Sequence, residues 1–140
     1  MVVAVVRGGL VGVDIERLAP GLEIDALVPH LLSDQELIPF AHVAPQDQAR
    51  GLLTYWTRKE ALLKATGDGM RAQMNAITVS SPDTPALLRQ WSGRLESLPR
   101  VTMQTLYPGP DYVGALAVLG LPTVQVQEFD GHGLLGSMLR

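Results

Sequence analysis

The sequence predicts one α+β domain in which an antiparallel sheet is packed by a long helix. Three observations favour this fold class: β-branched segments lie near both ends, a helical pattern fills residues 45–66, and short turns separate the expected strands. The 140 residues fit one domain and suffice to bury roughly 70% of the unfolded surface. The chain shows no internal repeat and no low-complexity segment, so no second domain is expected.

Two strands are expected first, at residues 1–6 and 10–16, joined through the glycines at positions 8 and 9 as in a hairpin. Side chains of a strand alternate between its two faces. One face, which is expected to pack, carries Val11, Val13 and Ile15. The other face, which is expected to present carboxylates beside a glycine, carries Gly12, Asp14 and Glu16.

Helices are expected next. Residues 22–32 have helical spacing, and residues 33–36, SDQE, form a capping box for a short helix that Pro39 would disturb. Pro45 suits the first turn of the long helix, which should run to about Thr66 and end at Gly67, a suitable C-terminal capping residue.

Strands dominate the rest of the chain. Residues 76–80 are expected to form a strand, residues 87–98 are ambiguous between helix and strand, and residues 100–106 and 112–119 should form an antiparallel pair. The sequence after Pro122 has no firm pattern. We therefore expect a domain over residues 1–120 and a C-terminal tail over residues 121–140.

The composition excludes several function classes. The chain is 46% hydrophobic and 18% charged with a net charge of -3, which argues against disorder and against bulk nucleic-acid binding. It has no cysteine, hence no disulfide, no thiolate catalysis and no cysteine zinc site, and a cytoplasmic enzyme is expected. The six-residue apolar opening is too short for a signal peptide or a membrane span, so no membrane partner is expected.

The long helix carries the candidate chemistry. Side chains four residues apart lie one turn above another, so Trp56, Glu60 and Lys64 project from one face. Residues 50–71 hold both lysines of the chain, and five basic residues against two acidic ones. This local positive charge indicates a small anionic ligand or an acidic partner.

The acidic residues suggest a metal site, but not uniquely. Asp14, Glu16 and Glu60 would supply three hard oxygen ligands suited to Mg²⁺, and Lys64 could neutralise a phosphate bridged to that ion. An Asp-x-Glu pair at a strand end is, however, more often a solvated edge. Glu60 with Lys64 is also an ordinary helix-stabilising pair worth about 0.3–0.5 kcal/mol. Spacing alone leaves the function open.

Two motifs together resemble the paired signature of the 4'-phosphopantetheinyl transferase superfamily: GVDIE at residues 12–16 and WTRKEALLKATGDGM at residues 56–70. They occur in the family's order and with its spacing. The stretch that contains Ser33 and Glu36 resembles the family's F-S-x-x-E segment, and the resemblance extends to Gly120. In detail the chain is similar to the C-terminal half of the surfactin-synthetase-activating type, which is common in natural-product pathways.

The resemblance implies transfer of the phosphopantetheine arm of coenzyme A to a serine of an acyl or peptidyl carrier protein, with release of adenosine 3',5'-bisphosphate. It assigns Asp14, Glu16 and Glu60 to Mg²⁺. It assigns Lys64 to the coenzyme A pyrophosphate and places Lys59 nearby as a second cofactor-binding residue. Either Glu60 or a water molecule at the ion would take the serine proton, so Glu60 and Lys64 are the expected catalytic residues.

The resemblance also implies partners. The acidic helix of a carrier protein would meet the side of Arg50, Arg58 and Arg71. Long members of the family have an N-terminal half with a Ser-His motif, and this chain begins just before the second half, so a homodimer or other homo-oligomer is expected to complete the cleft. The alternatives are a catalytically incomplete relative that serves as a binding module, or a protein that needs a second chain.

Overall fold

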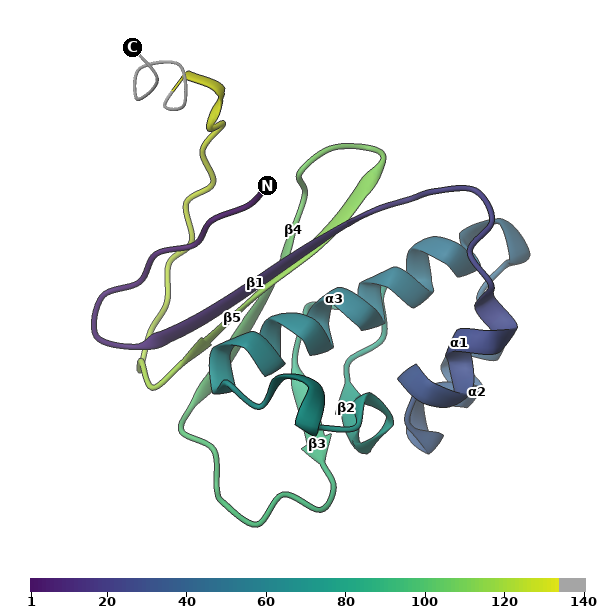
Figure 1. Cartoon of the computed structure of the whole chain (residues 1–140), viewed down its shortest axis with the longest axis horizontal. Helices are drawn as coiled ribbons and strands as arrows, with labels where there is room; N and C mark the ends of the chain where they lie inside the picture. The colour runs from purple at the N-terminus through teal and green to yellow at the C-terminus, as the bar shows by residue number, and fades with distance from the viewer. Residues whose placement is uncertain (134–140) are drawn as a thin grey trace.

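The computed structural model describes residues 1–133 and shows a long helix packed across an antiparallel sheet, with two short helices and a smaller sheet beside it (Figure 1). The predicted α+β fold is confirmed. In chain order the elements are β1 (Leu10–Arg17), α1 (Ile24–Leu31), α2 (Asp34–Ala41), η1 (Pro45–Asp47), α3 (Gln48–Thr66), η2 (Gly69–Arg71), η3 (Met74–Ala76), β2 (Ile77–Val79), β3 (Leu88–Trp91), β4 (Val101–Leu106) and β5 (Tyr112–Leu119).

The larger sheet has the strand order β1-β5-β4 and is antiparallel throughout. The predicted pairing of the last two strands is therefore confirmed. In β1, Gly12 lies opposite Ala117 and Asp14 lies opposite Ala115. Directly opposed residues of an antiparallel pair point to the same face, so the carboxylate face of β1 continues into a face of small alanines on β5.

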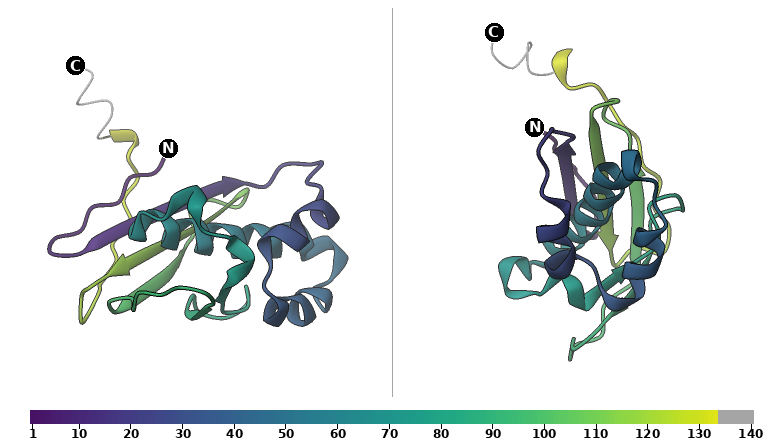
Figure 2. Two further views of the ribbon diagram at one scale, coloured as in Figure 1. Left: turned by 60° about the horizontal axis from the view of Figure 1, so that its bottom comes forward. Right: turned by 90° about the vertical axis from the view of Figure 1, so that its right-hand side faces the viewer.

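Helix α3 lies across this face (Figure 2). Its ends follow the prediction: Pro45 opens η1 directly before the helix, and Gly67 ends it with a φ of 78°, a left-handed conformation that glycine adopts without strain. Side chains on most sides of α3 are buried, because β1 and β5 lie against one side and α1, α2 and β2 against others. The helix is thus the centre of the core.

The other face of the larger sheet is covered by the two ends of the described chain, which lie together in Figure 1. Val6 and Val124 pack there against Leu116 and the neighbouring residues of the sheet. The prediction of a strand at residues 1–6 is wrong, because this segment joins no β ladder and Val5 is exposed. A β-branched composition favours a strand only where a neighbouring strand is free to pair.

The remaining elements follow the sequence closely. Ser33 and Glu36 form the predicted capping box of α2, and the backbone N–H of Ser33 donates to Oε2 of Glu36 at 2.8 Å. The expected helix over 22–32 is α1, and the expected strand over 76–80 is β2. The ambiguous residues 87–98 contain β3, antiparallel to β2. The end of the expected tail, after residue 133, lies outside the described residues.

Within residues 1–133, no helix combines the length and the apolar character needed to cross a bilayer.

Candidate active site

Lys64 and Asp14 form the centre of the candidate site. The Nζ of Lys64 donates to Oδ1 of Asp14 at 2.9 Å and to the carbonyl of Val13 at 3.2 Å, which ties the end of α3 to the middle of β1. The Lys64 side chain is 50% exposed and that of Asp14 only 9%. The second oxygen of Asp14, Oδ2, is buried without a hydrogen-bond partner in the described chain. An unpaired buried carboxylate oxygen is costly, so this position favours a bound cation or a donor.

Glu16 and Glu60 lie beside this pair. Burial raises the pKa of Glu16 above its ordinary value of 4.5, the Asp14 carboxylate raises it further, and hydrogen bonding from Trp56 and the charge of Lys64 lower it. Burial and Asp14 also raise the pKa of Glu60, while Lys64 lowers it. Both glutamates therefore lie close enough to Asp14 and Lys64 to interact with their charges. We call Asp14, Glu16, Glu60 and Lys64 the acidic cluster.

Gly12 sets the spacing between β1 and α3. A Cβ atom at this position would lie 2.0 Å from the carbonyl oxygen of Ala61 and 2.5 Å from the backbone nitrogen of Ala65. The strand therefore touches the helix backbone, and this approach brings Asp14 to Lys64. The predicted carboxylate face of the strand includes this glycine but gives it no role. An isolated glycine inside a β-branched strand is itself a signal of close backbone approach.

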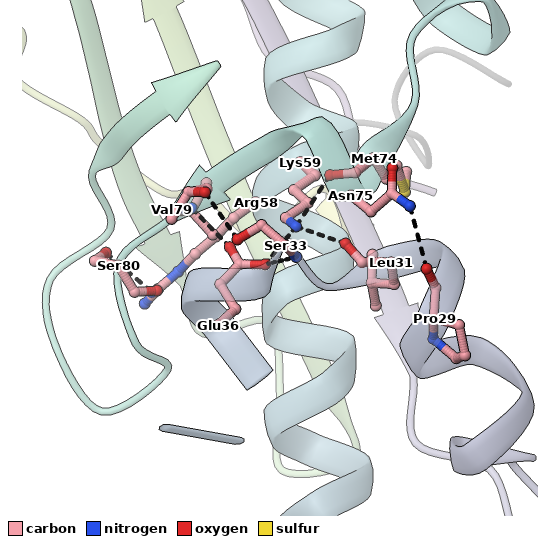
Figure 3. A network of polar contacts seen from close by, with 11 residues as sticks. Pro29, Leu31, Ser33, Glu36, Arg58, Lys59, Met74, Asn75, Val79 and Ser80 are labelled. Carbon is pink, nitrogen blue, oxygen red and sulfur yellow. Dashed lines mark hydrogen bonds and ion pairs between the residues drawn. The ribbon is translucent and has the colours of Figure 1, made fainter. Parts of the chain in front are cut away.

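Lys59 does not join the acidic cluster. Its side chain is fully buried, and its Nζ donates to Oε2 of Glu36 at 2.6 Å, to the carbonyl of Leu31 at 2.6 Å and to the carbonyl of Met74 at 3.1 Å (Figure 3). These three acceptors use all three N–H groups of the ammonium. The expectation that Lys59 binds coenzyme A must therefore be corrected, since its donors are already used in the interior.

Glu36 is equally well satisfied. Its Oε2 accepts hydrogen bonds from Lys59 and from the backbone of Ser33, and its Oε1 accepts one from the backbone N–H of Val79 at 2.7 Å. Burial lowers the pKa of Lys59, and the Glu36 carboxylate opposes that change. We call Lys59 and Glu36 the buried ion pair. It joins α3, α2 and β2.

The expected basic surface is smaller than the sequence suggested. Arg58 is buried, and its guanidinium donates to the carbonyls of Ser80 and Thr84, each at 2.8 Å. Arg50 is exposed and donates to the carbonyl of Pro110 at 2.5 Å. The inclusion of Arg58 in a carrier-facing surface was wrong, because the acceptors that bury it come from segments distant in sequence.

The acidic cluster fits Mg²⁺ in its chemistry. Three carboxylates supply hard oxygen ligands. Burial first, and then the charge of Asp14, raise the pKa values of Glu16 and Glu60, and a divalent cation would favour the ionised form of both. In residues 1–133 no three acidic or histidine side chains are already arranged as a metal site. Glu16 and Glu60 are only partly buried, so neither carboxylate is enclosed in the core.

A family model matches residues 10–117, from β1 into β5, and it describes the 4'-phosphopantetheinyl transferase superfamily. The chain belongs to this superfamily. Among curated proteins, it is similar to the 4'-phosphopantetheinyl transferase HetI of Nostoc sp. (strain PCC 7120), with 31% identity over 111 residues. The similarity covers 79% of this chain and 44% of HetI, so the chain spans less than half the length of that relative.

Solved structures of the superfamily show the same fold. The holo-[acyl-carrier-protein] synthase of Thermotoga maritima has a TM-score of 0.66 at 16% identity, with 79% of this chain and 62% of that chain covered. The holo-(acyl-carrier-protein) synthase of Bacillus anthracis, solved in complex with CoA (3',5'-ADP), has a TM-score of 0.65 at 19% identity, with 79% and 94% covered. At these identities the likeness establishes the fold alone.

Proposed function

We propose that this superfamily member transfers the 4'-phosphopantetheine arm of coenzyme A to a serine hydroxyl of an acyl or peptidyl carrier protein, with Mg²⁺. One observation carries the proposal: a buried Asp14 oxygen without a partner lies among two glutamates of raised pKa and a half-exposed lysine. Membership of the superfamily and the named activity of HetI support this reaction class.

Asp14, Glu16 and Glu60 would hold the Mg²⁺. When bound, the ion would offset negative charge on the pyrophosphate of coenzyme A, as in other phosphoryl transfers. Lys64 would bind the same pyrophosphate. Because its side chain is half exposed, its ammonium can turn from Asp14 to a phosphate oxygen once a cation satisfies the carboxylate.

The reaction is an in-line displacement at phosphorus. The serine oxygen forms a bond to the phosphorus that carries the pantetheine arm, and the bond from that phosphorus to the second phosphate breaks. The electron pair leaves with adenosine 3',5'-bisphosphate. Lys64 provides positive charge beside the oxygens that gain negative charge. The serine proton passes to Glu60 or to a water molecule that Glu60 orients.

We further propose that residues 1–120 form the transferase-like domain and correspond to the C-terminal half of the surfactin-synthetase-activating type. The 44% coverage of HetI supports a half-length correspondence, and the choice of the C-terminal half rests on the two motifs at residues 12–16 and 56–70. A second copy of the chain would bring further cationic side chains to the nucleotide end of coenzyme A, and we therefore propose a homodimer or other homo-oligomer.

A transfer assay tests the activity. The protein is incubated with apo carrier protein, coenzyme A and Mg²⁺, and the carrier is weighed by mass spectrometry. We expect the mass to rise by one phosphopantetheine arm with the wild type and with Glu96→Gln, an exposed control, but not with Glu60→Gln. Transfer only after addition of another chain would favour the two-chain alternative, and none at all would favour the binding module.

Metal titration separates the two roles of Glu60. If Glu60 is a ligand, Glu60→Gln lowers Mg²⁺ affinity together with turnover. Unchanged Mg²⁺ affinity with lost turnover would show that Glu60 is the direct base instead. Light scattering in the presence of coenzyme A tests assembly, and a stable monomer that binds coenzyme A tightly would count against the oligomer.

A further inference from the structure

The acidic cluster includes its own cation. The Nζ of Lys64 donates to Oδ1 of Asp14 at 2.9 Å and to the carbonyl of Val13 at 3.2 Å, which uses two of the three N–H groups of the ammonium. The charge of Lys64 also lowers the pKa of Glu16 and that of Glu60. One ammonium therefore offsets negative charge on all three carboxylates.

This internal compensation is incomplete. Burial and the charge of Asp14 raise the pKa of both glutamates, and the opposing effect of Lys64 is the smallest of these contributions. Oδ2 of Asp14 has no hydrogen-bond partner among residues 1–133. The cluster therefore still favours a divalent cation, which supplies more positive charge than one ammonium.

A cation at Oδ2 of Asp14 conflicts with the ammonium at Oδ1. Both oxygens belong to one carboxylate, so the two positive charges would lie within a few ångströms of each other and repel. The Asp14 side chain is 9% exposed, so little water is present to screen this repulsion. The Lys64 side chain is 50% exposed, so its ammonium can move into solvent while the buried carboxylate stays in place.

The packing of β1 on α3 does not depend on this ion pair. Gly12 contacts the helix backbone directly, since a Cβ atom there would lie 2.0 Å from the carbonyl oxygen of Ala61. The ladder between β1 and β5 continues on both sides of Asp14. The release of Lys64 therefore leaves the backbone of the acidic cluster unchanged.

We propose that Lys64 is an internal counter-ion of the acidic cluster, which lowers the affinity for Mg²⁺ alone and is released to a phosphate when the ion displaces it from Asp14. The proposal rests on the proposed function for the identity of the ion and of the phosphate, which is the pyrophosphate of coenzyme A. Mg²⁺ and coenzyme A then bind cooperatively through Lys64, and each raises the affinity for the other by the same factor.

Calorimetric titration with Mg²⁺ alone tests the counter-ion. We expect Lys64→Met, which removes the charge at similar length, to bind Mg²⁺ about tenfold more tightly than the wild type. Lys64→Arg keeps the charge and should stay within about threefold of the wild type. Lys64→Gln is a second neutral variant should Lys64→Met not fold.

Arg17→Met is the matched control for the loss of one positive charge. Arg17 is exposed and follows Glu16 in the sequence, but its side chain lies on the other face of β1. Water and salt screen its charge, so Arg17→Met should change the Mg²⁺ affinity by less than about threefold. An increase as large as that of Lys64→Met would show that net charge, and not the contact with Asp14, sets the affinity.

NMR spectroscopy makes the release visible, because the chain has only two lysines. In protein with isotope-labelled lysine, we expect Mg²⁺ to move the side-chain signals of Lys64 toward those of a free lysine in water. The signals of Lys59 should not move, because its three N–H groups are bonded in the interior. Lys64 signals that stay in place while the ion saturates the site would overturn the proposal.

Coenzyme A binding with and without Mg²⁺ tests the coupling. Without Mg²⁺, the wild type and Lys64→Met should bind coenzyme A within about threefold of each other, because Asp14 holds the ammonium. With saturating Mg²⁺, the wild type should bind coenzyme A at least about tenfold more tightly than the variant. An equal loss in the variant under both conditions would overturn the coupling.

The outcomes separate this proposal from the proposed function. Equal Mg²⁺ affinities of the wild type and the neutral variants would overturn the counter-ion and leave the proposed metal ligands unaffected. A tighter Mg²⁺ site in Lys64→Met without any effect on coenzyme A would support the counter-ion and overturn the assignment of Lys64 to the pyrophosphate. If neither protein bound Mg²⁺, both proposals would fail.

Discussion

Two lysines on adjacent turns of α3 differ completely in their surroundings. Lys59 is fully buried, all three of its N–H groups have acceptors, and its carboxylate partner Glu36 is satisfied at both oxygens. Lys64 is half exposed and forms an ion pair with one carboxylate oxygen of Asp14. The other carboxylate oxygen of Asp14 has no hydrogen-bond partner among the described residues. The same helix therefore carries one complete polar network and one incomplete network.

This difference separates structural from functional charge. A fully satisfied buried network specifies how the segments pack, and nothing further can bind to it. An incomplete network with partly exposed members has an acceptor without a hydrogen-bond partner, and a ligand can bind to that acceptor. The sequence motif KEALLK contains both kinds of lysine, so the motif alone does not distinguish them.

The largest expected effect is on stability, at the buried ion pair. Lys59→Met should lower the free energy of unfolding by about 3–5 kcal/mol, because it leaves the buried charge of Glu36 without its cationic partner. Lys64→Met should change it by less than about 1 kcal/mol, since that pair is partly exposed. Urea denaturation measures both. Equal losses would show that the two lysines do not differ as described.

The next effect is on catalysis, at the acidic cluster. Asp14→Asn should lower kcat/KM by about 10²–10³-fold, the magnitude seen when one preorganised electrostatic group is removed. Its free energy of unfolding should stay within about 1 kcal/mol of the wild type. Asp111→Asn, at an exposed position, serves as the control for both measurements. A loss of stability as large as that of Lys59→Met would place Asp14 among the structural residues.

A smaller effect is expected on the pH dependence of stability. The folded-state pKa of Glu60 is raised above 4.5, so its contribution is fully present below about pH 4.5 and is lost as the pH rises through the raised folded value. Without divalent cation, the Tm of the wild type should therefore fall relative to that of Glu60→Gln between about pH 4.5 and 7. Parallel Tm curves for the two proteins would contradict the raised pKa.

Added Mg²⁺ sharpens this test. A cation at the acidic cluster favours the ionised carboxylates, so saturating Mg²⁺ should remove the fall in the wild type. The variant Glu96→Gln, which changes an exposed glutamate, should keep the wild-type pH profile with and without Mg²⁺.

The smallest expected effect is at an ion pair that belongs to neither network. Arg94 pairs with Asp68 at 2.5 Å and stacks on the ring of Trp91 at 4.5 Å from its centroid. Both partners are partly exposed, so Arg94→Ala should cost at most about 1 kcal/mol and less at high salt. Transfer activity should not change. A larger loss of stability would mean that the exposure of an ion pair does not predict its contribution to the free energy of unfolding in this protein.

Much of the fold was predictable because local signals agreed with tertiary packing. The capping box at Ser33, the left-handed Gly67 and the pairing of β4 with β5 all follow from short sequence patterns. The segment 1–6 did not follow its pattern, since β-branched residues predict a strand only if a partner edge is available. Its position on the outer face of the sheet depends on long-range packing that no local pattern contains.

The candidate site was predictable in its members but not in its division of roles. The alternation of side chains on β1 correctly grouped Asp14 with Glu16. The helical spacing on α3 correctly grouped Glu60 with Lys64, and both lie near Asp14. Lys59 was assigned to the ligand because its acceptors, the carbonyls of Leu31 and Met74, are backbone atoms with no sequence signature. Burial of a lysine depends on where such carbonyls converge in space.

Gly12 has no side chain, yet its contact with the backbone of α3 sets the distance between β1 and α3 on which the whole site depends. A single methyl group there would push the strand from the helix and separate Asp14 from Lys64, although every proposed ligand would still be present in the sequence. Relatives that keep all the acidic residues but replace this glycine should therefore be read as inactive until a compensating change on the facing turn of the helix is found.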